Sequence, residues 1–302
     1  MPRALVTGID GFTGRYMAVA LKAGGYEVAG LTLQQANGQK GMFACDLLDY
    51  KRVAQVVHEV KPDVVVHLAA VSFVAHADKD AFYMINIVGT RNLLRALATA
   101  DLEPRTVLLA SSANIYGDAQ IDPITESTPA APQNDYAVSK YSMELMAGLW
   151  QGKLPIVITR PFNYTGAGQS ANFLLPKIVD HFRRGAQQIE LGNLDVARDF
   201  SDVRDVVDQY MRLLACSPSG KTFNVCSGRS ASLGEVLDMM ASIAGHQIEV
   251  TVNPEFVRDK EIKRLRGSNA NLASVIGDLN PIPLRETLGW MFETGDASRR
   301  TP

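Results

Sequence analysis

The chain has 302 residues, of which 46% are hydrophobic and 21% charged, and its formal net charge at pH 7 is −2. This composition supplies a large hydrophobic core and gives no electrostatic reason to expect nucleic acid or an anionic membrane as a partner. A membrane span is also not expected, because the longest apolar run, residues 64–77, contains His67 and falls short of the roughly 18 residues that a span requires.

Short β-branched runs alternate with longer helical patterns through the first half of the chain. The N-terminus enters a strand pattern at once and lacks the apolar segment of a signal peptide, so we expect a cytoplasmic protein. The expected strands are residues 4–7, 27–32, 63–69, 106–111 and 155–159, and the expected helices are residues 12–23, 50–60, 81–100 and 136–151. This alternation predicts right-handed crossovers and a parallel sheet covered on both faces, which is a Rossmann-like, doubly wound α/β fold.

The regular alternation loosens after about residue 163. Further helices are expected at residues 172–184, 203–215 and 232–244, between segments that contain Gly and Pro. This pattern predicts a smaller, interwoven substrate-binding lobe rather than a detachable module. The expected dinucleotide-binding domain comprises residues 1–163 and returning segments near 195–226, and the expected smaller lobe comprises residues 164–194 and 227–302.

A glycine-rich turn follows the first expected strand. Gly8, Gly11 and Gly14 have GxxGxxG spacing, which allows a tight turn, close approach of the backbone to a pyrophosphate, and a helix N-terminus that faces the phosphates. The alternative is a glycine-rich turn without a ligand, but the position at the first strand–helix junction favours a nucleotide site. The residues that we expect at the cofactor here are Gly8, Asp10, Gly11, Phe12, Gly14 and Arg15.

The end of the second expected strand bears on the choice of cofactor. Its sequence, from Leu31 to Gln35, contains no carboxylate to bind the ribose 2′-hydroxyl, so NAD(H) is not strongly selected. Arg15 is a candidate to meet a 2′-phosphate, although a solvated surface arginine is an equal alternative. The sequence therefore slightly favours NADP(H) over NAD(H).

Tyr136 and Lys140 are spaced one helical turn apart. A neighbouring cation favours the phenolate, so we expect Tyr136 to exchange a proton with a substrate hydroxyl or carbonyl near neutral pH. Ser112 follows the expected strand 106–111 and so lies at the same sheet edge as the glycine loop. A serine pair at a strand end is often only part of a turn, but together these residues indicate carbonyl–alcohol redox chemistry.

Four motifs carry a family resemblance that covers nearly the whole chain. In order, residues 7–14, 67–70, 111–117 and 136–140 resemble the motifs of the extended short-chain dehydrogenase/reductases, the nucleotide-sugar epimerase/dehydratase superfamily. The resemblance implies a triad of Ser112, Tyr136 and Lys140, in which Lys140 also holds the nicotinamide ribose. It further implies cofactor contacts from Asp46, Leu47, Leu68, Ala69 and Ala70, with Asp46 and Leu47 bracketing the adenine.

The second half resembles segments that bind the substrate. Asn163 lies in a segment similar to the one whose Asn touches the sugar diphosphate, and residues 191–200 resemble the branch that acts on GDP-mannose derivatives. Arg198 and Arg266 are candidate phosphate clamps, because a guanidinium donates a fixed fork of hydrogen bonds. The alternatives are that Arg198 pairs with Asp202 or Asp205, and that the basic run 258–266 is a solvated face. The expected substrate contacts are Ser72, Ser112, Asn114, Asn163, Arg198 and Arg266.

Asn114 separates two reactions within this branch. GDP-mannose 4,6-dehydratases carry a Glu at this position as the acid/base for water elimination, and an amide cannot abstract a proton. The resemblance therefore favours reduction of a GDP-linked 4-keto-6-deoxy sugar, and residues 264–272 also look more like the reductases. Elimination would need a substitute acid from Asp118, Asp122 or Glu126. The same motifs are also compatible with a nucleotide-sugar 4-epimerase and with a non-catalytic dinucleotide-binding regulator.

The cysteines and histidines show no metal-binding pattern. Neither the histidines nor Cys45, Cys216 and Cys226 have ligand or CxxC spacing, so we expect no metal and no disulfide framework.

The family resemblance also implies a homodimer. Its four-helix interface would be built from the helices near 81–100 and 136–150. Apolar residues that could serve either that interface or the core are Leu93, Leu94, Leu97, Met143, Met146 and Leu149.

Overall fold

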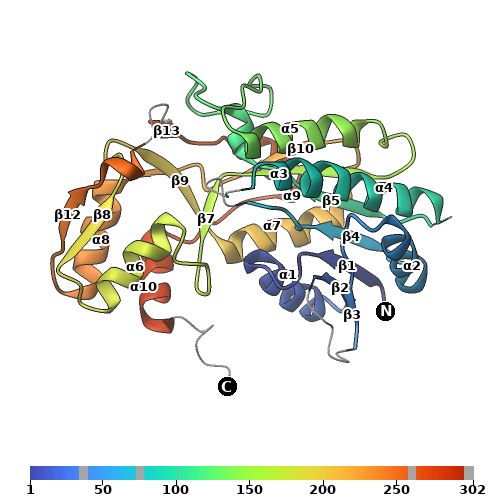
Figure 1. Ribbon diagram of the computed structural model, residues 1–302, viewed down its shortest axis with the longest axis horizontal. Coiled ribbons are helices and arrows are strands. Elements are labelled where there is room, and N and C mark those ends of the chain that lie inside the picture. The colour runs from blue at the N-terminus through green and yellow to red at the C-terminus, as the bar shows by residue number, and fades with distance from the viewer. Residues whose placement is uncertain (34–39, 73–77, 101, 258–262, 296–302) are drawn as a thin grey trace.

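Seven parallel strands form the central sheet of the protein, in the order β10-β6-β5-β4-β1-β2-β3 (Figure 1). The computed structural model describes residues 1–33, 40–72, 78–100, 102–257 and 263–295. The strands of this sheet are β1 (Arg3–Thr7), β2 (Glu27–Thr32), β3 (Met42–Ala44), β4 (Val64–His67), β5 (Thr106–Ala110), β6 (Ile156–Pro161) and β10 (Thr222–Val225). The strand order changes direction at β1, so the carboxyl ends of β1 and β4 form the switch point where open α/β sheets bind ligands. The predicted doubly wound fold is confirmed.

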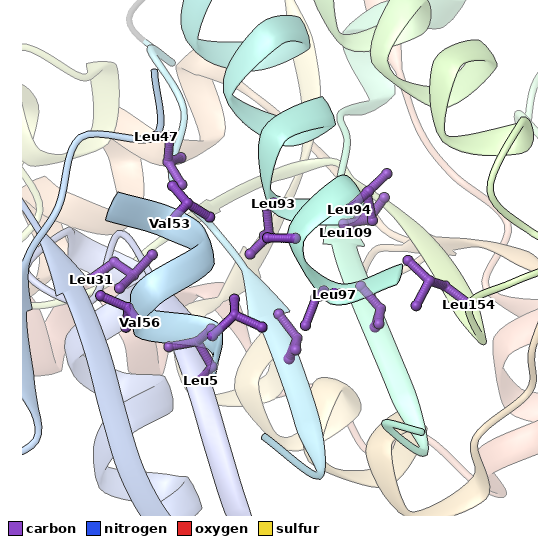
Figure 2. Packing of buried hydrophobic residues seen from close by; sticks show 14 of the residues in the cluster. Leu5, Leu31, Leu47, Val53, Val56, Leu93, Leu94, Leu97, Leu109 and Leu154 are labelled. Carbon is purple, nitrogen blue, oxygen red and sulfur yellow. The ribbon is translucent and has the colours of Figure 1, made fainter. Parts of the chain in front are cut away.

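Alternating residues of each central strand pack into opposite helical layers. On β1, Leu5 belongs to one hydrophobic cluster and Ala4 and Val6 to the other. The first layer consists of α2 (Tyr50–Val60), α4 (Thr90–Thr99) and α5 (Asp135–Gly148), and the second of α1 (Phe12–Ala23), α7 (Val203–Cys216) and α9 (Ala270–Ile276). Figure 2 shows part of the first cluster, in which Leu5 of β1 lies near Val56 of α2. Because each fully buried Leu or Val contributes about 1.5–3 kcal/mol, these two clusters hold the layers on the sheet.

The expected helix over residues 81–100 is divided into three parts. A short helix α3 (Asp80–Tyr83) leads into a π-helical turn η1 (Met84–Gly89), which continues into α4. The turn buries Asn86, whose side chain accepts from Val71 N at 3.1 Å, and Gly89, which packs against Leu47. A π-turn inserts one extra residue per turn and is often found at functional sites. Tertiary contacts of Asn86 and Gly89 therefore accompany the departure from a regular helix.

A smaller part lies at the left of Figure 1. It contains β7 (Asn163–Thr165), β8 (Gln188–Leu191), β9 (Ala197–Asp202), β11 (Ser230–Ser232), β12 (Glu249–Val252), β13 (Arg264–Leu265), α6 (Leu174–Arg183), α8 (Leu233–Ala244), η3 (Pro254–Phe256) and α10 (Leu284–Thr294). β9 pairs with β7, β11 and β13, whereas β10 returns to the large sheet, so the chain passes between the two parts more than once. The domain boundaries stay a prediction.

Within the described ranges, no helix is both long enough and apolar enough to cross a membrane.

Candidate active site

The glycine loop forms a narrow cradle between β1 and α1. Gly8 has a φ of +69°, and a Cβ placed on it would lie 2.8 Å from the Ala69 nitrogen. A Cβ on Gly14 would lie 2.1 Å from the Gly8 carbonyl oxygen. Gly11 caps α1 without any side-chain hydrogen bond, which leaves the N-terminal N–H groups of the helix to an anion. The cradle therefore fits the pyrophosphate of a dinucleotide.

The predicted adenine contacts, Asp46 and Leu47, lie against α4 and η1. The buried Leu47 packs against Gly89, and its carbonyl accepts a hydrogen bond from Asn92 Nδ2 at 2.9 Å. Asp46 is exposed, and its Oδ1 accepts from the Leu48 nitrogen at 2.9 Å. The structure thus fixes the backbone of this pair and leaves the Asp46 carboxylate at the surface.

The His67–Ala70 motif joins β4 to the glycine loop. Leu68 N donates to the Thr7 carbonyl at 3.2 Å, and Ala69 N donates to the Thr7 hydroxyl at 3.2 Å. Ala70 and Ser72 follow this junction, with Ser72 exposed just before residues outside the described ranges. The expected cofactor residues at the ends of β1 and β4 are therefore adjacent.

Arg15 faces the smaller part of the molecule. Its Nη2 donates to the Gly168 carbonyl at 3.1 Å, and the neighbouring Phe12 stacks on Tyr164 with ring centroids 6.1 Å apart. This contact gives no support to the predicted role of Arg15 at a 2′-phosphate. Gln34 and Gln35, which follow β2, lie outside the described residues.

Ser112, Tyr136 and Lys140 meet beyond the carboxyl end of β5. Ser112 is the N-cap of η2 (Ala113–Tyr116), and its Oγ accepts from the Asn114 nitrogen at 3.2 Å. The Ser112 side chain lies close enough to Tyr136 to act on its hydroxyl and lower its pKa. Lys140 Nζ donates to the carbonyl of Ala110, the last residue of β5, at 2.7 Å. The predicted triad therefore forms one cluster, in which Tyr136 is 8% and Lys140 4% exposed.

The ionisation of this cluster differs from the expectation. Burial raises the pKa of Tyr136 to about 12, although the hydrogen bond from Ser112 acts to lower it. The expectation that Lys140 makes Tyr136 acidic near neutral pH is thus wrong for the protein alone, because desolvation of the phenolate dominates. Burial also lowers the pKa of Lys140 to about 8, with Glu144 opposing that shift. Tyr136 is therefore a protonated phenol at neutral pH, which is the form that a proton donor needs.

A buried hydrogen-bond chain supports the triad from behind. His67 Nε2 lies 2.8 Å from the Thr90 hydroxyl, which donates to the Asn86 carbonyl at 2.7 Å. Asn86 Nδ2 donates to Ser139 Oγ at 2.9 Å, and Ser139 donates to the Tyr136 carbonyl at 2.8 Å. Burial lowers the pKa of His67 to about 3, so the ring is neutral. Asn86 is not among the residues predicted from the sequence, although a polar residue within the otherwise apolar run 84–89 is a usable signal.

The candidate phosphate ligands are engaged by groups of the protein itself. Arg266 Nε donates to Asp122 Oδ1 at 2.7 Å, and this bond holds the pKa of Asp122 below its usual range. Arg198 Nη1 donates to the carbonyls of Ala197 and Lys263 at 3.0 and 3.3 Å. Asn163 begins β7, beside β9, which carries Arg198. The structure thus brings Arg198 close to the strand that contains Asn163. Arg266, which follows β13, contacts the separate loop that contains Asp122.

The acidic partners suggested for Arg198 have other hydrogen bonds. Asp202 accepts from Arg204 Nη2 at 2.7 Å and from the Thr287 hydroxyl at 2.7 Å. Asp205 accepts from the Ile282 nitrogen at 2.8 Å. These carboxylates therefore fasten α7 to the segment around α10.

Two of the downstream acids that could replace the base for elimination have structural roles. Glu126 Oε1 accepts from the Asn224 nitrogen at 2.8 Å, and its Oε2 accepts from Asn271 Nδ2 at 2.7 Å. Asp122 is paired with Arg266. Both carboxylates are therefore engaged by groups of the protein itself.

Comparison with known proteins agrees with this geometry. A model of the NAD dependent epimerase/dehydratase family matches residues 4–226. The chain belongs to this family. A GDP-6-deoxy-D-talose 4-dehydrogenase from Aggregatibacter actinomycetemcomitans is 36% identical over 277 residues, which cover 91% of this chain and 92% of the relative. A GDP-6-deoxy-D-mannose reductase from Pseudomonas aeruginosa is 34% identical over 299 residues, with 95% and 94% covered.

Solved structures of the family share the whole fold. An epimerase candidate from Burkholderia cenocepacia J2315 is 51% identical, with a TM-score of 0.92 and 98% of both chains covered. The protein RMD from Pseudomonas aeruginosa, solved with NADPH, is 32% identical, with a TM-score of 0.87 and 99% and 100% of the chains covered. The predicted membership of the epimerase/dehydratase superfamily is confirmed.

Metal ligands are not grouped anywhere in the part of the chain that the structure describes, where no cluster of three or more His, Cys, Asp or Glu side chains could hold an ion.

Proposed function

We propose that this protein reduces the C4 ketone of a GDP-linked 4-keto-6-deoxy sugar with NADPH or NADH. The substrate is GDP-4-keto-6-deoxy-D-mannose, and the product is GDP-D-rhamnose or its 4-epimer. The observation that carries the proposal is the burial of Tyr136 and Lys140 together beyond the carboxyl end of β5, where Ser112 follows the strand. The family resemblance adds that Asn114 stands where the dehydratases carry their base. The two curated relatives, which act on GDP-6-deoxy sugars, support this choice of substrate.

Each residue of the triad has a definite task in this reaction. When bound, NAD(P)H supplies the hydride that is added to C4. Ser112 polarises the ketone by donating a hydrogen bond to its oxygen, and Tyr136 gives that oxygen its proton, so the carbonyl becomes a secondary alcohol. Lys140 offsets the negative charge that Tyr136 acquires when it loses the proton. The glycine cradle would hold the pyrophosphate of the cofactor, and Lys140 would also hold its nicotinamide ribose.

Two configurations at C4 are compatible with this chemistry. The sugars named for the two relatives, 6-deoxy-D-talose and 6-deoxy-D-mannose, differ only at C4. Both products follow from the same triad, because the hydride and proton reach the same carbonyl carbon and oxygen. The face of the sugar ring that is presented to the nicotinamide decides between them.

A turnover assay tests the proposed function. Purified protein mixed with NADPH and GDP-4-keto-6-deoxy-D-mannose is expected to oxidise NADPH, which is measured as a loss of its nicotinamide absorbance. NMR of the product then identifies the configuration at C4. GDP-mannose is the matched control, since it has no ketone and should cause no consumption. No loss of absorbance with the keto sugar, using either NADPH or NADH, contradicts the proposal. Turnover of a nucleotide sugar without added cofactor, by protein that copurifies with NAD, indicates a 4-epimerase instead.

The exposed apolar surface supports a homodimer through α5 and η1. Leu93, Leu94, Leu97 and Met143 belong to the core of the protein itself, and Met146 packs against that core. By contrast, Leu145 and Leu149 at the end of α5 are 61% and 83% exposed, and Met84 of η1 is 45% exposed. We propose that these exposed residues contribute to the four-helix interface, because a dimer removes such side chains from water.

Light scattering tests this interface. The wild-type protein is expected to be a dimer, and the double variant Leu145→Glu/Leu149→Glu a monomer, because the new charges would be buried without partners. Val19→Glu is the matched control, since Val19 on α1 is 69% exposed and outside the proposed interface. A monomeric wild type, or a double variant that remains dimeric, excludes this interface.

We also propose a cytoplasmic location. Cys45, Cys216 and Cys226 are all free thiols, which suits a reducing compartment.

A further inference from the structure

Glu144 extends the buried face of α5 that carries the triad. Tyr136, Lys140 and Glu144 follow at intervals of four residues, so their side chains lie along one side of the helix. All three are buried, and Glu144 is 7% exposed. A carboxylate at such a site needs a strong partner, because desolvation of an unpaired charge is costly.

Arg160 of β6 is the partner that Glu144 requires. Its Nε lies 3.0 and 3.2 Å from the two carboxylate oxygens of Glu144, and its Nη2 donates to Oε2 at 2.6 Å. Arg160 Nη1 donates to the Tyr116 hydroxyl at 2.9 Å, and that hydroxyl donates to Asn224 Oδ1 at 2.7 Å. The guanidinium is thus fixed from both sides, and the Glu144 carboxylate is held one turn from Lys140.

Among the groups around Lys140, Glu144 is the one whose charge favours the protonated ammonium group. On β4, His67 is neutral and so adds no charge, and on β5 the Ala110 carbonyl accepts from Nζ. Glu144 favours the charged form of Lys140 against the effect of burial. Other titratable groups on α5, or on the elements packed against it, are Asp80 and Tyr83 of α3, Tyr116 of η2, Arg91 and Arg95 of α4, and Asp135 and Tyr141 of α5.

We propose that Glu144, fixed by Arg160, is a positioning residue that keeps Lys140 protonated for proton transfer from Tyr136 and for binding of the nicotinamide ribose. Lys140 must carry a positive charge to offset the developing phenolate, so its neutral form is inactive. Burial alone moves Lys140 toward the neutral form, and the carboxylate counteracts burial. The part of this inference that concerns turnover rests on the proposed function, whereas the part that concerns Lys140 and the cofactor does not.

The pH profile of Glu144→Gln tests the inference. Loss of the carboxylate lowers the pKa of Lys140 further, and the unpaired Arg160 cation acts in the same direction. The high-pH limb of kcat/KM is therefore expected to move to lower pH by about one to two units, while the rate at pH 6 stays within about threefold of wild type. Glu144→Asp retracts the charge by one methylene, so its limb is expected to move in the same direction by less.

NADPH binding measured across the same pH range, without any sugar, is a second readout. Its high-pH weakening is expected to shift in the same order, from wild type through Glu144→Asp to Glu144→Gln. If the variants shift the pH dependence of NADPH binding but the wild type shows no turnover, the proposed function is refuted and the role of Glu144 is supported. Activity and binding that change equally at every pH mean that Glu144 is merely structural. If Glu144→Gln does not fold, the test rests on Glu144→Asp. A folded Glu144→Asp protein whose high-pH limb of kcat/KM stays at the wild-type position overturns the inference.

Discussion

Tyr136→Phe is expected to lower kcat by about 10²- to 10⁴-fold and to leave NADPH affinity within a few-fold of wild type. The substitution removes the hydroxyl that donates the proton, and it retains the ring, whose centroid lies 6.0 Å from that of Phe82. Ser112 remains to polarise the ketone, so a residual rate is expected. Steady-state kinetics with the keto sugar, together with fluorescence titration of NADPH, measure the two effects separately.

Tyr210→Phe is the matched control for this prediction. Tyr210 is also a buried tyrosine, and Tyr136 lies near enough to raise the pKa of Tyr210. The Tyr210 hydroxyl, however, accepts a hydrogen bond from the Thr159 hydroxyl at 3.1 Å. Loss of this hydroxyl is expected to change kcat by less than about threefold, because the phenol faces the core and not the sugar. A Tyr136→Phe enzyme with more than a tenth of the wild-type kcat contradicts the assignment. Equal losses in both variants point to packing rather than proton transfer.

Gly14→Ala is expected to weaken NADPH binding by about 100-fold or more. The added Cβ would lie 2.1 Å from the Gly8 carbonyl oxygen and 2.7 Å from the Ile9 Cα. These are backbone atoms, so no side-chain rotation relieves the overlap, and α1 must move away from the loop. Such overpacking costs about 1–3 kcal/mol of stability, occasionally more. NADPH titration and thermal unfolding, each carried out with and without cofactor, test both consequences.

Gly289→Ala provides the control for an added methyl group. Gly289 lies within α10, and beyond the neighbouring backbone of that helix a Cβ there meets no atom within 4 Å. Because Ala is the better helix former, stability is expected to rise by up to about 1 kcal/mol, with unchanged NADPH affinity. A Gly14→Ala protein that binds NADPH as tightly as Gly289→Ala would show that the glycine cradle does not contact the cofactor.

Local patterns were sufficient to predict the layered fold and the location of Ser112, Tyr136 and Lys140 near the end of β5. The alternation of short β-branched runs with amphipathic segments specifies which residues enter the sheet, as Leu5 and its neighbours show by packing into opposite layers. The glycine spacing and the interval from Tyr136 to Lys140 depend only on turn and helix geometry over a few residues. Ser112 follows from the rule that parallel strands present their carboxyl ends at one edge. These features were predictable because each depends on a pattern of residues that are close together in the sequence.

Contacts between distant segments decided the rest. No local periodicity specifies the π-turn at Asn86. The same holds for two ion pairs, Arg266–Asp122 and Glu144–Arg160, whose partners are far apart in the sequence.

Ionisation also depends on the assembled structure. From spacing alone, Lys140 was expected to make Tyr136 acidic, whereas burial raises the pKa of Tyr136 to about 12. The sequence by itself therefore determined which groups meet at the end of β5. Only the tertiary structure decided their protonation, because desolvation depends on everything that is packed around a group.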